Sequence, residues 1–176
     1  LMEPIEASIR YLSNSRNLSD FVGIVVQATT ELWSSTSPRL RSRKPPLAFL
    51  RFLADLFGKS PVIRDRIASE INFSSLVLVS CSRIDKGTPS SKVLPFLRLL
   101  TSLSSSPLFQ SLIPDASKSL IQFLKSQIQN TEINAWCFAI IAFLLRNCPP
   151  FEEVFSRDQT ASGLTSDAIR SLRSPD

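Results

Sequence analysis

The residues in this chain that could act as nucleophiles or metal ligands are few. Three cysteines, Cys81, Cys137 and Cys148, are widely spaced along 176 residues, and the sequence contains no histidine. Histidine is the commonest general base and metal ligand among side chains, so its absence excludes a Ser-His-Asp triad, a Cys-His pair and an HExxH zinc site. A zinc site built on the three cysteines would need a carboxylate or a water as its fourth ligand. We therefore expect no enzyme, no metal and no cofactor.

The cysteines also indicate a compartment. An odd number at wide spacing is not the disulfide framework of a small secreted protein, and we find no signal-peptide pattern. Buried free cysteine behaves as a small apolar residue, which is the interpretation we adopt for all three thiols. The sequence therefore predicts an intracellular protein, cytoplasmic or nuclear.

The apolar stretch at 135–145 raises the alternative of a membrane span. It is about half as long as the roughly 20 residues that a helix needs to cross a bilayer. Asn134 precedes it, and Arg146 and Asn147 follow it. We expect one buried helix of a globular domain here and no membrane segment.

Basic residues offer the other candidate chemistry. The formal net charge is +5, and the segment 39–44 reads RLRSRK directly before two prolines. Such a run can be a nucleic-acid-binding arm or a nuclear-import signal. A solvent-exposed loop between two helices is the simpler interpretation of the same residues.

Helices must position these residues, because the sequence repeats itself with a helical pattern. The segment 49–56 (FLRFLADL) recurs at 96–103 (FLRLLTSL) and again, with more changes, at 138–145 (FAIIAFLL). A Ser-Pro or Cys-Pro dipeptide follows each copy, and proline suits the first position of a helix. A short helix and a longer helix with apolar residues at helical spacing fit between the copies. Strand patterns are missing, so the sequence predicts an all-α protein.

Units of 42 to 47 residues with three helices each resemble armadillo repeats. The resemblance covers 47–155 and implies a right-handed α-solenoid of about three armadillo-like units. Residues 1–38 would form an incomplete first repeat, in which Ser19 caps a helix that reaches Trp33. Residues 39–46 would be a basic loop with two prolines, and 156–176 a polar tail with a short helix.

In armadillo proteins the third helices of successive units line a groove. In the importin-alpha and beta-catenin branches, a ladder of asparagines along this groove holds an extended peptide, and the importins add tryptophans four residues earlier. By this resemblance the asparagine positions fall on Asp55, Ser102 and Leu144, and the tryptophan positions fall on Arg51, Arg98 and Ile140. The ladder is absent, so we do not expect a nuclear-import receptor.

Arg51 and Arg98 recur at equivalent positions, and the resemblance places both in the groove near Lys92. Guanidinium groups bind carboxylate or phosphate with two parallel hydrogen bonds. The pair therefore predicts a partner with an acidic or phosphorylated segment. The alternative is that both arginines only face solvent.

The third copy lacks the arginine, and its apolar residues cover all sides of a helix. Such a helix must be covered. We expect an exposed strip around Ile140 and Leu144, with Trp136 nearby, that binds an amphipathic partner helix or a second copy of the chain. The predicted partner-binding residues are Arg51, Asp55, Lys92, Arg98, Ser102, Trp136, Ile140 and Leu144.

A second resemblance is narrower. The segments 64–65, 79–81, 120–124, 128–129 and 145–147 are similar to the N-terminal armadillo region of the family of the cancerous inhibitor of protein phosphatase two A. This resemblance implies a homodimeric intracellular scaffold whose partners include phosphatase regulatory subunits and DNA-damage adaptors.

The sequence therefore predicts a non-enzymatic protein-interaction scaffold that binds a partner segment or helix through the groove and its apolar C-terminal end. Two alternatives stay open. One is a nucleic-acid-associated solenoid of DNA repair, recombination or chromosome structure. The other is a regulatory subunit or inhibitor of a phosphatase.

Overall fold

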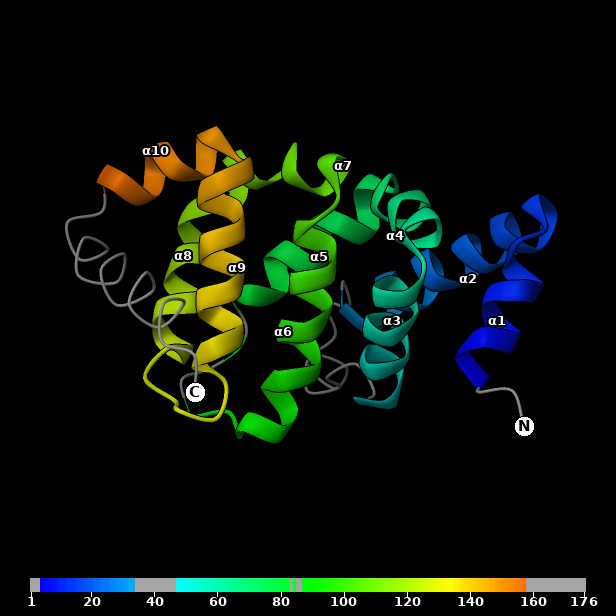
Figure 1. Cartoon of the computed structure of the whole chain (residues 1–176), viewed down its shortest axis with the longest axis horizontal. Helices are drawn as coiled ribbons and strands as arrows, with labels where there is room; N and C mark the ends of the chain where they lie inside the picture. The colour runs from blue at the N-terminus through cyan, green and yellow to red at the C-terminus, as the bar shows by residue number, and fades with distance from the viewer. Residues whose placement is uncertain (1–3, 34–46, 83, 85–86, 158–176) are drawn as a thin grey trace.

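The computed structural model describes residues 4–33, 47–82, 84 and 87–157 (Figure 1). Regular structure in these residues is entirely helical, which confirms the all-α prediction. The helices are α1 (Pro4–Leu12), α2 (Ser15–Trp33), α3 (Leu47–Lys59), α4 (Pro61–Ala68), α5 (Ile71–Cys81), α6 (Ser90–Ser104), α7 (Pro107–Gln110), α8 (Ile113–Gln127), α9 (Asn134–Asn147) and α10 (Pro149–Arg157). The predicted basic loop at 39–46 and nearly all of the predicted tail at 156–176 lie outside the described residues.

The helices form two rows of long helices and an edge of short ones. In the first row α3, α6 and α9 lie side by side and run in the same direction, with α1 against α3 at one end (Figure 1). In the second row α2 packs against α5, and α5 packs against α8. The short helices α4 and α7 contact each other along one edge, where α10 covers α8 and α9. None of these described helices is long and apolar enough to span a membrane.

Edge-to-face phenylalanine pairs join the two rows at successive places. Phe57 of α3 meets Phe73 of α5 with ring centres 6.2 Å apart, and Phe96 of α6 meets Phe123 of α8 at 5.7 Å. All four rings are almost completely buried. Aromatic pairs in this geometry stabilise a fold by about 0.5–1.5 kcal/mol beyond their buried area. The core therefore runs as one layer between the rows.

Local sequence explains where the helices begin. The Ile63 amide donates to Ser60 Oγ at 3.5 Å, so Ser60 caps α4 directly before Pro61. The prediction that Ser19 caps the second helix is wrong, because Ser19 lies inside α2. Asn14 takes that role: its Oδ1 accepts a hydrogen bond from the Arg16 amide at 2.9 Å. An asparagine side chain satisfies the first free amides of a helix at least as well as a serine does.

The predicted exposed strip on α9 is also wrong, because Ile140 and Leu144 are 0% exposed. The repeat pattern aligns Phe138 of α9 with Phe96 of α6. This alignment differs by one residue from the alignment that the structure gives. The buried Ile140, Ile141 and Leu144 stand where Leu99, Leu100 and Leu103 stand in α6. Phe143, 37% exposed, takes the solvent-facing place instead.

The ends of the three helices show why the register differs. The Cys148 amide bonds the Leu144 carbonyl, and the Ser60 amide bonds the Leu56 carbonyl, each four residues back. In α6 the Ser106 amide bonds the Leu103 carbonyl, only three residues back. The last turn of α6 is therefore tighter by one residue. An alignment of α9 with α6 that matches their proline turns therefore shifts every residue of α9 by one position.

We predict that the corrected register shows in stability. Ile140→Asp buries an unpaired charge and should lower the free energy of unfolding by about 4 kcal/mol or more. Phe143→Asp, on the exposed side of the same helix, should change it by less than about 1 kcal/mol. Urea denaturation followed by circular dichroism measures both. If the two variants were equally stable, the burial of Ile140 and the exposure of Phe143 would be wrong.

Candidate functional site

Four of the eight predicted partner-binding residues line one surface pocket. The pocket has a volume of about 480 Å³ and lies where α1, α3 and α6 meet, with a tryptophan from α9 at its side. We call it the Arg98 pocket. Its lining consists of Ile5, Ala54, Asp55, Gly58, Lys59, Arg98, Thr101, Ser102 and Trp136.

Two contacts hold Arg98 in this pocket. Its guanidinium carbon lies 5.6 Å from the centre of the Trp136 ring, a cation–π contact that orients the side chain. Its Nη1 lies 4.0 Å from Asp55 Oδ1, and the two side chains are 46% and 47% exposed. An ion pair at this distance and exposure contributes about 1 kcal/mol or less, because water screens it. Arg98 is thus oriented by the tryptophan and only weakly held by the aspartate.

The remaining pocket residues supply a small apolar area and two hydroxyl groups. Ile5 of α1 and Ala54 of α3 provide aliphatic surface. The Thr101 hydroxyl donates to the Leu97 carbonyl at 2.9 Å, so its proton is already used. The charged groups of the lining are the cations Lys59 and Arg98 and the anion Asp55. This composition suits an anionic group with apolar neighbours.

The other predicted site residues lie elsewhere. Arg51 and Lys92 are exposed, on α3 and in the first turn of α6, and neither lines the pocket. Ile140 and Leu144 are buried in the core. The prediction missed the other lining residues, which are Ile5, Ala54, Gly58, Lys59 and Thr101. Lys59 follows Asp55 by one helical turn, a spacing visible in the sequence. Ile5 could not be predicted, because only the packing of α1 on α3 brings it there.

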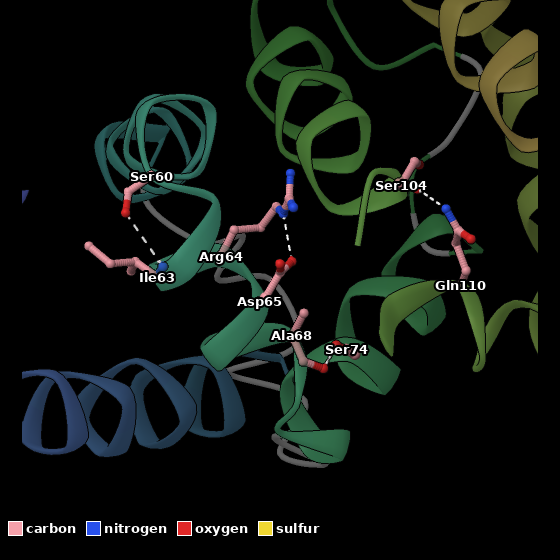
Figure 2. A network of polar contacts seen from close by, with 8 residues as sticks. All are labelled: Ser60, Ile63, Arg64, Asp65, Ala68, Ser74, Ser104 and Gln110. Atoms are coloured by element: carbon pink, nitrogen blue, oxygen red, sulfur yellow. Dashed lines mark hydrogen bonds and ion pairs between the residues drawn. The ribbon is translucent and has the colours of Figure 1, made fainter. Parts of the chain in front are cut away.

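A second polar cluster lies at the edge formed by α4 and α7 (Figure 2). Arg64 Nε donates to Asp65 Oδ1 at 2.8 Å, and the Arg64 side chain is only 13% exposed. Gln110 donates to the Ser104 carbonyl at 2.8 Å, next to the end of α6. These bonds satisfy backbone and charged groups at helix ends. The Gln110 bond joins α7 to the end of α6, whereas the Arg64–Asp65 bond stays within α4. The largely buried Arg64 presents little of itself to a ligand.

Asp65 carries the one carboxyl group with a clearly shifted pKa among the described residues. Partial burial raises this pKa, but the Arg64 hydrogen bond and charge, with the adjacent Ser106 hydroxyl, lower it by more. The net effect is a pKa below the usual value. The Ser106 hydroxyl itself is buried, and none of the described residues lies in hydrogen-bond geometry with it.

The three cysteines are free and buried, as predicted for Cys137. Burial raises the pKa of the Cys137 thiol to about 12 and that of Cys81 even further. Cys148 follows α9 as its C-cap residue, with its Sγ 3.9 Å from the Gln110 carbonyl oxygen. Within the described ranges no three cysteine or carboxylate side chains gather where they could hold a metal ion.

Comparison of the chain with protein-family models, with curated proteins and with solved structures gave no match.

Acid should weaken the edge cluster. Because folding lowers the Asp65 pKa, the stability it contributes is fully present above the unfolded pKa of about 3.9 and is lost as pH falls through the folded value. Asp65→Asn should therefore be less stable than wild type near neutral pH, and the difference should shrink below about pH 4. Urea titrations across this pH range measure it. Glu132→Gln, an exposed loop residue, is the control. A difference that stays constant with pH would contradict the assignment.

Thiol reactivity should be suppressed in the native state. A thiol reagent attacks the thiolate, and burial disfavours both ionisation and access. At about pH 8 we expect negligible reaction of the native protein with a disulfide reagent over minutes, and three equivalents after unfolding in denaturant. Rapid reaction of one native equivalent would show that a cysteine is accessible.

Proposed function

We propose that this protein is a non-enzymatic protein-interaction scaffold that binds an acidic segment of a partner protein at the Arg98 pocket. Its proposed architecture is a right-handed α-solenoid of armadillo-like units. The order short helix, long helix, long helix supports this architecture, because it occurs in α4–α5–α6 and again in α7–α8–α9. The pair α2–α3 and the single helix α10 fit as incomplete units at the two ends.

The observation that carries the proposal is the position of Arg98. The Arg98 guanidinium is half exposed, lies over the Trp136 ring and stands at the side of a pocket. It can therefore bind a carboxylate without the entropy cost of first ordering its side chain. Arg98 also faces only a distant and weakly bound anion, so an incoming carboxylate can replace Asp55 at little cost. A carboxylate on Arg98 would gain two charge-assisted hydrogen bonds.

The half-exposed guanidinium of Arg98 favours an acidic segment over a basic one. It does not favour nucleic acid in the same way. The described cations near the pocket alternate with Asp55 and do not form a continuous stripe along one face, which phosphate backbones require for tight binding. The basic run at 39–44 lies outside the described residues.

We place the protein inside the cell. Three free and buried thiols support this part of the proposal, because a reducing compartment keeps such cysteines unpaired.

Charge removal at Arg98 tests the proposal. A fluorescent peptide library rich in Asp and Glu, with a matched library of Asn and Gln, provides the probes. Wild type should prefer the acidic peptides, and Arg98→Gln should bind the selected ones about 10- to 100-fold more weakly, as expected for a lost hydrogen bond to a charged group. Arg51→Gln is the control, with an expected change below about threefold, because Arg51 lies outside the pocket.

Two outcomes would overturn it. One is equal binding of acidic and amide peptides by wild type. The other is an equal loss of affinity in the Arg51 and Arg98 variants, because this would indicate general charge attraction instead of a site.

A further inference from the structure

Two neighbouring hydroxyl groups line the Arg98 pocket, and they differ in what they bond. The Thr101 hydroxyl donates to the Leu97 carbonyl at 2.9 Å, four residues back in α6. A serine or threonine inside a helix commonly uses its proton in this way. Ser102 lines the same pocket, and none of the described residues forms a hydrogen bond with its hydroxyl group. The Ser102 proton is therefore available to a bound molecule.

The Arg98 guanidinium lies over the surface of α6, the helix that also carries Ser102. On one side it approaches α3, where Asp55 Oδ1 lies 4.0 Å from Nη1. On the other side it approaches α9, where the centre of the Trp136 ring lies 5.6 Å from the guanidinium carbon. Because α6 stands between α3 and α9 in the first row (Figure 1), these two contacts keep the guanidinium over α6 itself.

Ser102 stands on the same face of α6 as Arg98. It follows Arg98 by four residues, a spacing that makes two side chains neighbours on the surface of a helix. Asp55 occupies in α3 the position that Ser102 occupies in the repeated segment of α6, and its carboxylate reaches the Arg98 guanidinium. Since α3 and α6 lie side by side and run in the same direction, Ser102 is at a level of the row from which a side chain can meet a group bound to Arg98.

A carboxylate suits the donors that these two residues offer. A guanidinium group presents two parallel N–H groups to a carboxylate, and the serine hydroxyl adds one O–H group. The two carboxylate oxygens accept at about four lone-pair positions, so one carboxylate can bond all three donors. A carboxamide of the same shape has a single oxygen, and its own N–H groups would face donors. A second donor in the pocket therefore raises the preference for an acid over its amide.

We propose that Ser102 is a further binding residue of the Arg98 pocket and donates its hydroxyl proton to the carboxylate that Arg98 holds. Arg98 supplies the charge, and Ser102 reads the remaining acceptor positions of the same group. This inference rests on the proposed function, because it assigns a second donor to the acidic side chain of the bound segment.

Removal of the hydroxyl group tests the assignment. The probes are the acidic peptides that wild type selects, each with a counterpart in which the acidic residues are replaced by Asn or Gln. Ser102→Ala should weaken the acidic peptides about tenfold, as expected for a lost hydrogen bond to a charged group, and the amide peptides by less than about twofold. Fluorescence anisotropy titrations measure both affinities.

Thr101→Val is the matched control. It removes a hydroxyl group from the same pocket at nearly constant shape, but this hydroxyl already bonds the Leu97 carbonyl. Both kinds of peptide should therefore keep their affinity within about twofold. Circular dichroism and thermal unfolding confirm that the variants are folded.

The double variant shows whether the two donors act on one group. When Arg98→Gln is already present, the carboxylate is no longer held beside Ser102, so the further change Ser102→Ala should weaken acidic peptides by less than about threefold. Two residues that share a ligand group are not additive in this way, whereas independent residues are.

The outcomes separate the inference from the function beneath it. If acidic peptides bind no better than their amide counterparts, or if Arg98→Gln has no effect, the proposed function fails and the inference falls with it. If acidic peptides bind through Arg98, three results would overturn the inference alone: an unchanged affinity in Ser102→Ala, an equal loss for acidic and amide peptides, or additive effects in the double variant.

Discussion

The position of Arg98 depends on the burial of the residues on either side of it in α6. Leu97 and Leu99 are 0% exposed, and α6 is packed between α3 and α9 in the first row. A helix enclosed in this way keeps only a narrow strip of surface, and Arg98 stands on that strip. Its backbone therefore cannot rotate to take the guanidinium elsewhere without exposing leucine. The pocket is a consequence of the core beneath it.

The two partners of Arg98 act on it differently. The Trp136 contact is worth about 0.5–1 kcal/mol at an exposed site, and its geometry restricts the guanidinium plane. The Asp55 contact adds little energy but competes with any incoming anion. A ligand must therefore offer better hydrogen-bond geometry than Asp55 does, or additional apolar contact. A carboxylate that makes two hydrogen bonds to Arg98 meets this requirement, because the Asp55 oxygen lies 4.0 Å from Nη1.

The sequence predicted the all-α class and the helices that carry the candidate site, and it identified Arg98, Asp55, Ser102 and Trp136. It could do so because α3 and α6 have a polar face that fixes their phase. The same reasoning failed for α9, where nearly every position is apolar and no polar side marks the exposed face. Phe143 was missed for this reason. An alignment of α9 with α3, whose last turn has the same length, would have placed it correctly.

Arg64 and Arg98 show that the burial of an arginine, and not its residue type, decides whether it has a structural role or can bind a ligand. Arg64 is 13% exposed and bonds Asp65 at 2.8 Å, so its charge has lost much of its water and depends on that partner. Removing Asp65 would leave the Arg64 guanidinium poorly solvated and without this partner, which is destabilising. Arg98 is 46% exposed and keeps about half of its exposure to water. It can exchange Asp55 for a ligand at little desolvation cost, because both side chains of the pair are about half exposed. The fold thus fixes one arginine on a neighbouring carboxylate within α4 and leaves the other able to bind.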